Sequence, residues 1–177
     1  MIEQFKFLVQ DLRRWKINSI ENCFYTIFEQ GVWAAILYRL NRALYLINIP
    51  IIKIFIRIFC FFIFKFSESF LGVALRPGTE IGPGLYIVHT GVIRIHPEVK
   101  IGKNLVIGNS VTIGVRGDGY SGAPVIGDNV FIYTGAKVLG EIKIGNNVKI
   151  GANAVVLTDI PDNTTAVGVP AKIVNKL

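Results

Sequence analysis

The side chains best suited to acid–base catalysis are those of two histidines, His89 in the stretch IVHTG and His96 in the stretch IHPE. An imidazole ordinarily has a pKa of about 6.5, so it can accept the proton of a hydroxyl group at neutral pH and activate that hydroxyl as a nucleophile. Two histidines and scattered carboxylates lack the spacing of a metal site, and the sequence has no phosphate-binding glycine motif. The sequence therefore favours a site that works by proton transfer and needs no metal.

Both histidines lie in a segment that repeats every six residues. An aliphatic residue opens each hexad and glycine often follows it, as the opening positions show: Ile81, Ile87, Ile101, Ile107, Ile113, Ile126, Ile132, Val138, Ile144, Ile150 and Val156. A period of six fits neither a helix nor a single alternating strand, and hexapeptide repeats are typical of a parallel β-helix. We expect three hexads to form one triangular coil of about 18 residues, with the aliphatic side chains pointing inward.

The residues before the repeat have a different composition. Eleven of the 12 Phe and both Trp lie in the first 70 residues, whereas 16 of the 18 Gly lie from Gly78 onward. Apolar residues recur at helical spacing over residues 2–46. We therefore divide the chain into an α-helical segment over residues 1–74 and a mainly β domain over residues 75–177.

The most apolar stretch, residues 43–66, is long enough in principle to cross a bilayer, but Pro50, Lys53 and Arg57 argue against a simple span. Lys53 and Arg57 are four residues apart and share one helix face. We expect this stretch to lie on a membrane surface; packing on a partner subunit and a true span are the alternatives. The N-terminus has charges where a signal peptide would be apolar, which predicts a cytoplasmic protein, at the inner face of the membrane.

Charge and composition exclude two further classes of protein. The chain has a formal charge of +7 and is 51% apolar, which argues against long disorder. Residues 1–76 hold ten Lys or Arg against five Asp or Glu, but these cations lie among Phe and Ile and form no compact basic run. We therefore expect no nucleic-acid partner.

Three stretches resemble the left-handed parallel β-helix acyltransferases, the hexapeptide-repeat family: GLYIVHTGVIRIHPEVKIG at 84–102, PVIGDNVFIYTGAKVLGEIKIGNNVKIGANAVVL at 124–157 and DIPDNTTAVGVPAKIV at 159–174. More narrowly, they resemble serine acetyltransferases and their relatives that O-acetylate cell-surface polysaccharides. The resemblance implies a left-handed β-helix, acetyl-CoA as the acyl donor and a homotrimer with the CoA groove between subunits. We expect an O-acetyltransferase acting on a hydroxyl of a cell-surface polysaccharide or its sugar precursor. The alternatives are a serine O-acetyltransferase of cysteine biosynthesis and a scaffold without activity.

Within this resemblance His89 matches the catalytic histidine, which would act as the general base, and His96 matches a structural corner position. Serine acetyltransferases have an Asp immediately before the matching histidine, where this chain has Val88, and a second histidine after the loop that this chain lacks. The partner that orients His89 therefore stays open, with a backbone carbonyl and three carboxylates as candidates: Glu80, Glu98 and Asp118.

The resemblance also implies a groove for acetyl-CoA along the coils. Ala136 and Ala154 are 18 residues apart, as are Gly135 and Asn153, so each pair is expected to stack along one edge and admit the pantetheine arm. Lys172 matches a basic position near the nucleotide end of CoA. The irregular stretch VRGDGYSGAP at 115–124 predicts a loop that leaves the coil, and the resemblance implies that this loop reaches over the site.

Overall fold

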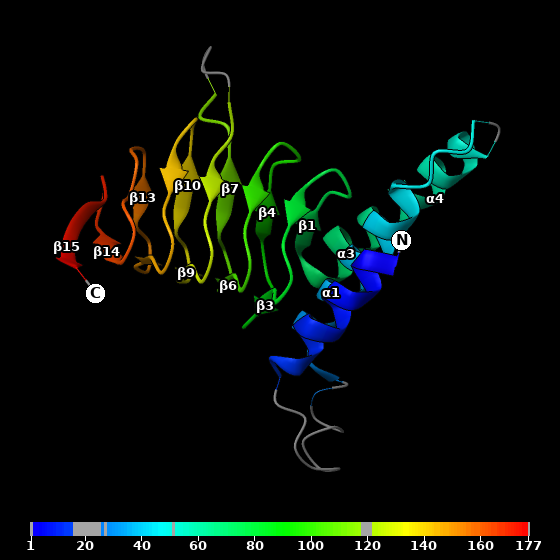
Figure 1. The fold of residues 1–177 in the computed structure, drawn as a ribbon, viewed down its shortest axis with the longest axis horizontal. Helices are drawn as coiled ribbons and strands as arrows, with labels where there is room; N and C mark the ends of the chain where they lie inside the picture. The colour runs from blue at the N-terminus through cyan, green and yellow to red at the C-terminus, as the bar shows by residue number, and fades with distance from the viewer. Residues whose placement is uncertain (1, 16–25, 27, 51, 118–121, 177) are drawn as a thin grey trace.

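The computed structural model describes residues 2–15, 26, 28–50, 52–117 and 122–176, and shows a three-sided column of short strands with helices at one end (Figure 1). The helices are α1 (Ile2–Arg13), α3 (Gln30–Tyr45), α4 (Lys53–Phe66) and the short π-helix η1 (Ser67–Leu71). The strands of the first half of the column are β1 (Val73–Leu75), β2 (Glu80–Ile81), β3 (Tyr86–Ile87), β4 (Ile93–Ile95), β5 (Lys100–Ile101), β6 (Val106–Ile107) and β7 (Thr112–Gly114). Those of the second half are β8 (Val125–Ile126), β9 (Phe131–Ile132), β10 (Lys137–Leu139), β11 (Lys143–Ile144), β12 (Lys149–Ile150), β13 (Val155–Val156), β14 (Thr164–Val167) and β15 (Lys172–Lys176).

Each of the first four coils contributes one strand to each of three parallel sheets, and the fifth contributes strands to two of them. Sheet A has the order β1-β4-β7-β10-β13, sheet B the order β11-β8-β5-β2, and sheet C the order β15-β14-β12-β9-β6-β3. Only β15 breaks the pattern among these strands, because it turns back and pairs antiparallel with β14 at the far end. The predicted parallel β-helix with a preceding helical segment is thus confirmed, and the column begins at Val73.

The interior of the column is built from the residues that open the hexads. All eleven predicted positions are buried, and four further positions, Leu75, Ile95, Ile160 and Ala166, complete the inward rows. Each aliphatic residue stacks on its equivalent in the next coil, as in the register of Ile87, Ile107 and Ile132. This stacking removes apolar surface from water along the whole length of the column.

A ladder of asparagines holds one corner of the column. Asn104, Asn129, Asn147 and Asn163 all have positive φ, a left-handed conformation that asparagine tolerates better than most residues. The side-chain amides of the first three each donate to the side-chain carbonyl oxygen of the asparagine in the next coil, at 2.8 to 3.0 Å. Only the first coil turns this corner with glycine, at Gly84, and in the later coils the asparagines make the turn and fix the spacing between coils.

The helices cap the first coil. α3 lies between α1 and α4 and packs on β3, so the helical segment is joined to the column and not separate from it. The Tyr38 hydroxyl of α3 donates to the Thr79 carbonyl oxygen at 2.7 Å. Gly31 allows the first turn of α3 to approach the Ile87 carbonyl, since a Cβ at this position would lie 2.3 Å from that oxygen.

The apolar stretch 43–66 is not one helix. α3 ends at Tyr45 and α4 begins at Lys53, with Pro50 in the connection. Among the described helices, none is both long enough and apolar enough to cross a membrane. Arg57 does not extend freely into solvent, because its guanidinium lies 3.3 Å from the centre of the Tyr45 ring.

Candidate active site

His89 lies at an irregular corner between sheet C and sheet A. From Ile87 to Ile95 the chain takes eight steps, whereas the equivalent corner of the next coil, from Ile107 to Ile113, takes six. The two extra residues push the corner outward and leave His89 exposed. The hexad slip in the sequence, just after His89, marks this bulge.

The backbone of this bulge is strained. Gly91 has a φ of 118° and Val92 a φ of 46°. A β-branched residue pays a steric penalty at positive φ, and such residues cluster at functional sites. Val92 is also mostly exposed, so burial of its side chain does not account for its position.

The N-terminus of α3 completes a recess around His89. The recess has a volume of about 440 Å³ and is lined by Phe28, Glu29, Gln30, Gly31, His89 and Thr90. The Thr90 hydroxyl donates to the side-chain carbonyl of Gln30, which ties the helix to the histidine corner. An imidazole at the mouth of an open recess can meet a small hydroxyl substrate and accept its proton.

The carboxylate in this recess is Glu29, which sequence reasoning missed. Glu29 lies at the N-cap of α3, 60 residues before His89, and no local motif connects the two positions. Two of the predicted partners lie elsewhere: Glu80 faces Arg42 at 4.0 Å, and the Glu98 amide donates to His96 Nδ1 at 3.4 Å. The third candidate, Asp118, lies outside the described residues, as does the centre of the predicted loop at 118–121.

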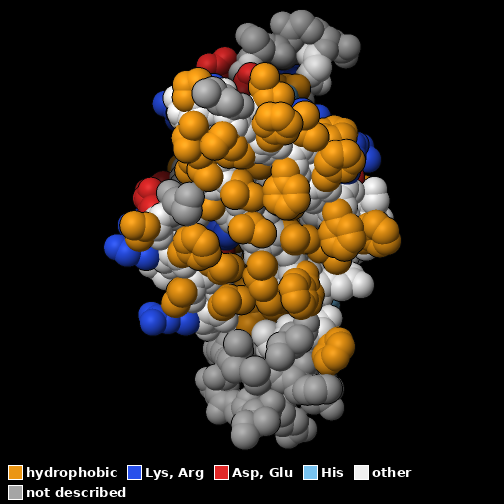
Figure 2. Space-filling model, turned by 90° about the vertical axis from the view of Figure 1, so that its right-hand side faces the viewer, with side chains coloured by type: hydrophobic (Ala, Val, Ile, Leu, Met, Phe, Trp, Pro, Cys, Tyr) orange, Lys and Arg blue, Asp and Glu red, His pale blue; other side chains and the backbone are white. Residues whose placement is uncertain are grey.

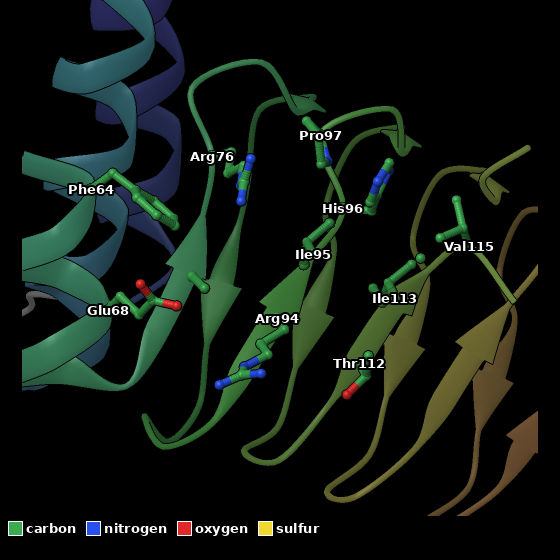
Figure 3. A pocket seen from close by; sticks show the side chains of 12 residues that line it. Phe64, Glu68, Arg76, Arg94, Ile95, His96, Pro97, Thr112, Ile113 and Val115 are labelled. Carbon is green, nitrogen blue, oxygen red and sulfur yellow. The ribbon is translucent and has the colours of Figure 1, made fainter. Parts of the chain in front are cut away.

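His96 occupies a second, separate pocket, shown in Figure 3. This pocket of about 360 Å³ lies between α4, η1 and sheet A, and its polar lining includes Glu68, Arg76, Arg94, His96 and Thr112. Its two guanidinium groups suit an anionic ligand. Lys65 bonds to Glu68 and, with the nearby arginines, holds the pKa of that carboxyl below its usual range.

The predicted CoA positions lie on the same corner as His89, farther along the column. Gly135 has a φ of 78°, and a Cβ on it would collide with the Asn153 side chain, so these two residues do stack as expected. Ala136 and Ala154 also stack as expected, because Lys137 and Val155 pair in register, but both are completely buried and their methyl groups point into the column. Only their backbone can face a groove.

Lys172 is exposed on β15 at the far end of the column from the helices. The structure thus places His89 and Lys172 near opposite ends of the β-helix (Figure 1). No group of three or more His, Cys, Asp or Glu that could hold a metal ion occurs among the described residues.

A three-sided column of hexapeptide coils, with an exposed histidine at a bulged corner, defines the class of left-handed β-helix acyltransferases. Residues 123–158 match the family model described as bacterial transferase hexapeptide (six repeats). The chain belongs to this hexapeptide-repeat transferase family.

Individual relatives agree with this placement. A serine acetyltransferase of Staphylococcus aureus is 45% identical over 113 residues, which cover 63% of this chain and 53% of the relative. The chain thus spans about half the length of the curated relatives it matches. The crystal structure of Neisseria gonorrhoeae serine acetyltransferase in complex with serine is 30% identical with a TM-score of 0.84, covering 98% of this chain and 70% of that one. A serine acetyltransferase structure in complex with CoA is 26% identical with a TM-score of 0.81, and the match covers 97% of this chain and 70% of that one.

These comparisons correct the expected acceptor. The prediction of a polysaccharide or sugar-precursor hydroxyl is wrong, because the relatives and the structural neighbours are serine acetyltransferases. The comparisons favour the alternative reading, in which the acceptor is serine.

Proposed function

We propose that this protein is an O-acetyltransferase that transfers an acetyl group from acetyl-CoA to the hydroxyl of serine. The observation that carries the proposal is the exposed imidazole of His89 at the mouth of the recess between the bulged corner and α3. The similarity to serine acetyltransferase structures with bound serine and with bound CoA supports both substrates.

The reaction needs a base, because an alcohol is a poor nucleophile at neutral pH. His89 accepts the hydroxyl proton as the serine oxygen attacks the thioester carbonyl. The resulting tetrahedral intermediate then expels the CoA sulfur, which takes up the proton that the imidazole holds. Backbone N–H groups along the coil would stabilise the oxyanion. The products are O-acetylserine and CoA, and the imidazole returns to its neutral form.

The recess offers a second group for the acceptor. Glu29 supplies a carboxylate that complements the ammonium group of serine, and this charge compensates in part for the missing Asp at Val88. Gln30 is held by Thr90 and fixes the helix end that presents Glu29. In this proposal Glu29 positions the acceptor, and His89 carries the chemistry.

CoA would lie along the corner that holds Gly135 and Asn153, with Lys172 near its phosphates. The corner is open to solvent at Asn153, and a homotrimer would cover it with a neighbouring column. We therefore include the homotrimer in the proposal, because one column alone supplies only one wall of such a groove.

The test is release of the CoA thiol from acetyl-CoA in the presence of serine, with a reaction lacking serine as the blank. We expect serine-dependent release by the wild-type protein and a loss of at least about 100-fold in His89→Ala. His96→Ala is the matched control and should keep most of the rate. No serine-dependent release, or equal rates in the wild type and His89→Ala, would overturn the proposal.

A further inference from the structure

The helical end of the column carries a broad apolar surface (Figure 2). We call it the helical end surface and define it by its exposed large apolar side chains: Ile2, Phe5 and Val9 of α1, Trp33 and Leu40 of α3, and Ile54, Phe55, Ile58, Phe59, Phe61, Phe62 and Phe66 of α4. Phe55 is 70% exposed and Phe62 is 64% exposed. Soluble monomers seldom leave a contiguous patch of this kind open to water, so the surface indicates an interaction site.

The three helices form one continuous surface. α3 lies between α1 and α4, and contacts both. A hollow of about 120 Å³ between α1 and α3 is lined by apolar side chains that include Phe5 and Leu40. A second hollow of about 520 Å³ between α3 and α4 is lined by side chains that include Leu37, Phe62 and Phe66. The apolar side chains of α1, α3 and α4 therefore adjoin one another across both hollows.

Basic side chains accompany this surface. Lys6 and Arg13 of α1 and Lys53 of α4 are exposed, and α4 contains no acidic residue. Residues 1–76 carry ten Lys or Arg against five Asp or Glu. Two of these acids, Asp11 and Glu68, already pair with basic side chains of the same segment. The surface therefore complements a partner that is both apolar and negatively charged.

An anionic bilayer surface fits this combination better than a two-fold contact with a second copy of the chain. A two-fold contact between copies would place the same patch against itself and bring like charges together. Anionic lipid offers acyl chains to the phenylalanines and headgroup phosphates to the lysines at the same time. α4 has 14 residues and is roughly 21 Å long, which is too short to cross a hydrocarbon core of about 30 Å.

We infer that the helical end surface docks on the surface of an anionic phospholipid bilayer, with α4 lying in the interface plane. The inference does not depend on the acceptor or on catalysis. The column then projects away from the membrane, where it can still meet the neighbouring columns of the proposed homotrimer. It would place the protein at the cytoplasmic face of the membrane, where anionic lipid is concentrated.

Vesicle flotation tests the inference with the full chain. We expect the protein to float with vesicles of phosphatidylcholine and phosphatidylglycerol, and to bind much less to phosphatidylcholine alone. Raised salt should weaken the binding, since it screens exposed charges. Absence of flotation with the anionic vesicles at low salt would overturn the inference.

Two pairs of variants separate the apolar and the charged contributions. Phe55, Phe59 and Phe62 share one face of α4, and their joint replacement by Ser should reduce flotation at least tenfold. The matched control replaces three exposed apolar residues of the column, V125S, I173S and V174S, and should float like the wild type. K6Q with K53Q should reduce binding to anionic vesicles several-fold, whereas K100Q with K149Q on the column should not.

Fluorescence gives a readout that is specific for contact with acyl chains. Trp33 is exposed on α3, whereas Trp15 packs against the Tyr86 ring at 4.7 Å. In Trp15→Phe, Trp33 is the remaining tryptophan, so its emission should shift to the blue on vesicle addition and be quenched by brominated acyl chains. Flotation without quenching would contradict docking through this face.

Light scattering of the protein without vesicles tests the alternative that this surface is a contact between copies of the chain. If F55S/F59S/F62S dissociates a larger assembly and the wild type does not float, the surface is a contact between copies and the inference is wrong. Docking on lipid is confirmed if the wild type floats and the variant does not. The variant must then also keep the assembly size and the thermal transition of the wild type.

Discussion

Arg39 and Asp11 form a buried ion pair that fastens the helices to the column. Arg39 Nε donates to Asp11 Oδ2 at 2.7 Å, and the two side chains are only 1% and 0% exposed. The other carboxylate oxygen accepts the amides of Gly84 and Leu85 at 2.7 and 2.8 Å. One side chain of α1 thus binds both α3 and the turn before β3, and so helps to fix α3, whose first turn lines the His89 recess.

The guanidinium group of Arg39 also has hydrogen-bond partners on the column. Its two terminal nitrogens donate to the carbonyl oxygens of Ile81 at 2.7 Å and Gly82 at 2.6 Å. Burial raises the pKa of Asp11, while Arg39 and the two amides oppose that rise. The pair is stable only because nearly every donor and acceptor around it has a partner.

We predict that Asp11→Asn lowers the free energy of unfolding by about 3–5 kcal/mol, because it leaves a buried guanidinium without its counter-charge. Urea unfolding measures this change. Lys65→Gln removes the exposed Lys65–Glu68 pair and should cost less than about 1 kcal/mol. If Asp11→Asn lowers the free energy of unfolding by as little as Lys65→Gln does, the role assigned to the buried pair is wrong.

Tyr38 should make the protein sensitive to alkaline pH. Burial raises the pKa of its phenol to about 12, and the hydroxyl donates to the Thr79 carbonyl. The unfolded chain releases this proton near pH 10, so the stabilisation is complete below about pH 10 and is lost as the pH rises toward about 12. This contribution of Tyr38 to the free energy of unfolding is about 2–3 kcal/mol.

The measurement is the free energy of unfolding as a function of pH in the wild type and in Tyr38→Phe. The variant should be less stable at neutral pH, and its stability should fall less steeply through the alkaline range. Identical slopes in the two proteins would show that Tyr38 ionises as freely in the folded state as in the unfolded state.

Gly31 should be needed for both stability and activity. A Cβ at this position would lie 2.3 Å from the Ile87 carbonyl oxygen, so Gly31→Ala must push α3 away from β3. We expect a loss of about 1–3 kcal/mol in stability and a lower rate of acetyl transfer, because Glu29 and Gln30 move with the helix end. Thermal unfolding and the thiol-release assay measure the two effects.

The matched control is Gly78→Ala, where the nearest atom to a new Cβ is the Pro97 Cβ at an ordinary 3.5 Å. This variant should behave like the wild type in both measurements. If the two alanine variants are indistinguishable, the close approach of α3 to β3 does not govern the recess.

We predict that Val92 lowers the stability of the fold but keeps the corner that carries His89 in its shape. Its positive φ costs of the order of 1–3 kcal/mol for a β-branched residue, whereas glycine adopts it freely at an entropic cost of about 0.5–1 kcal/mol. We expect Val92→Gly to gain about 1 kcal/mol in stability and to lower the acetyl-transfer rate, because the corner that carries His89 becomes looser. Asn104→Gly, at a left-handed position that already suits its residue, gains nothing from glycine and loses the side-chain hydrogen bond to Asn129, so it should lower stability by about 0.5–1.5 kcal/mol.

The strands could be predicted well because the hexad pattern is local. Each coil contacts the coils next to it, so an aliphatic residue at every sixth position specifies the inward rows wherever the chain goes next. The same pattern shows the bulge as a slip after Ile87. It could not show that Ala136 and Ala154 point inward, because small residues suit both a packed interior and a groove.

The amino-acid sequence by itself determined the β-helix, its division from the helical segment, and His89 as the group able to take a proton. Only the tertiary structure decided that Glu29 shares a recess with His89, that Arg39 meets Asp11 in the interior, and which faces of α1, α3 and α4 remain exposed. These contacts join residues 28 to 60 positions apart in the chain. Their positions depend on how three amphipathic helices dock on one end of the column, and no short-range repeat encodes that arrangement.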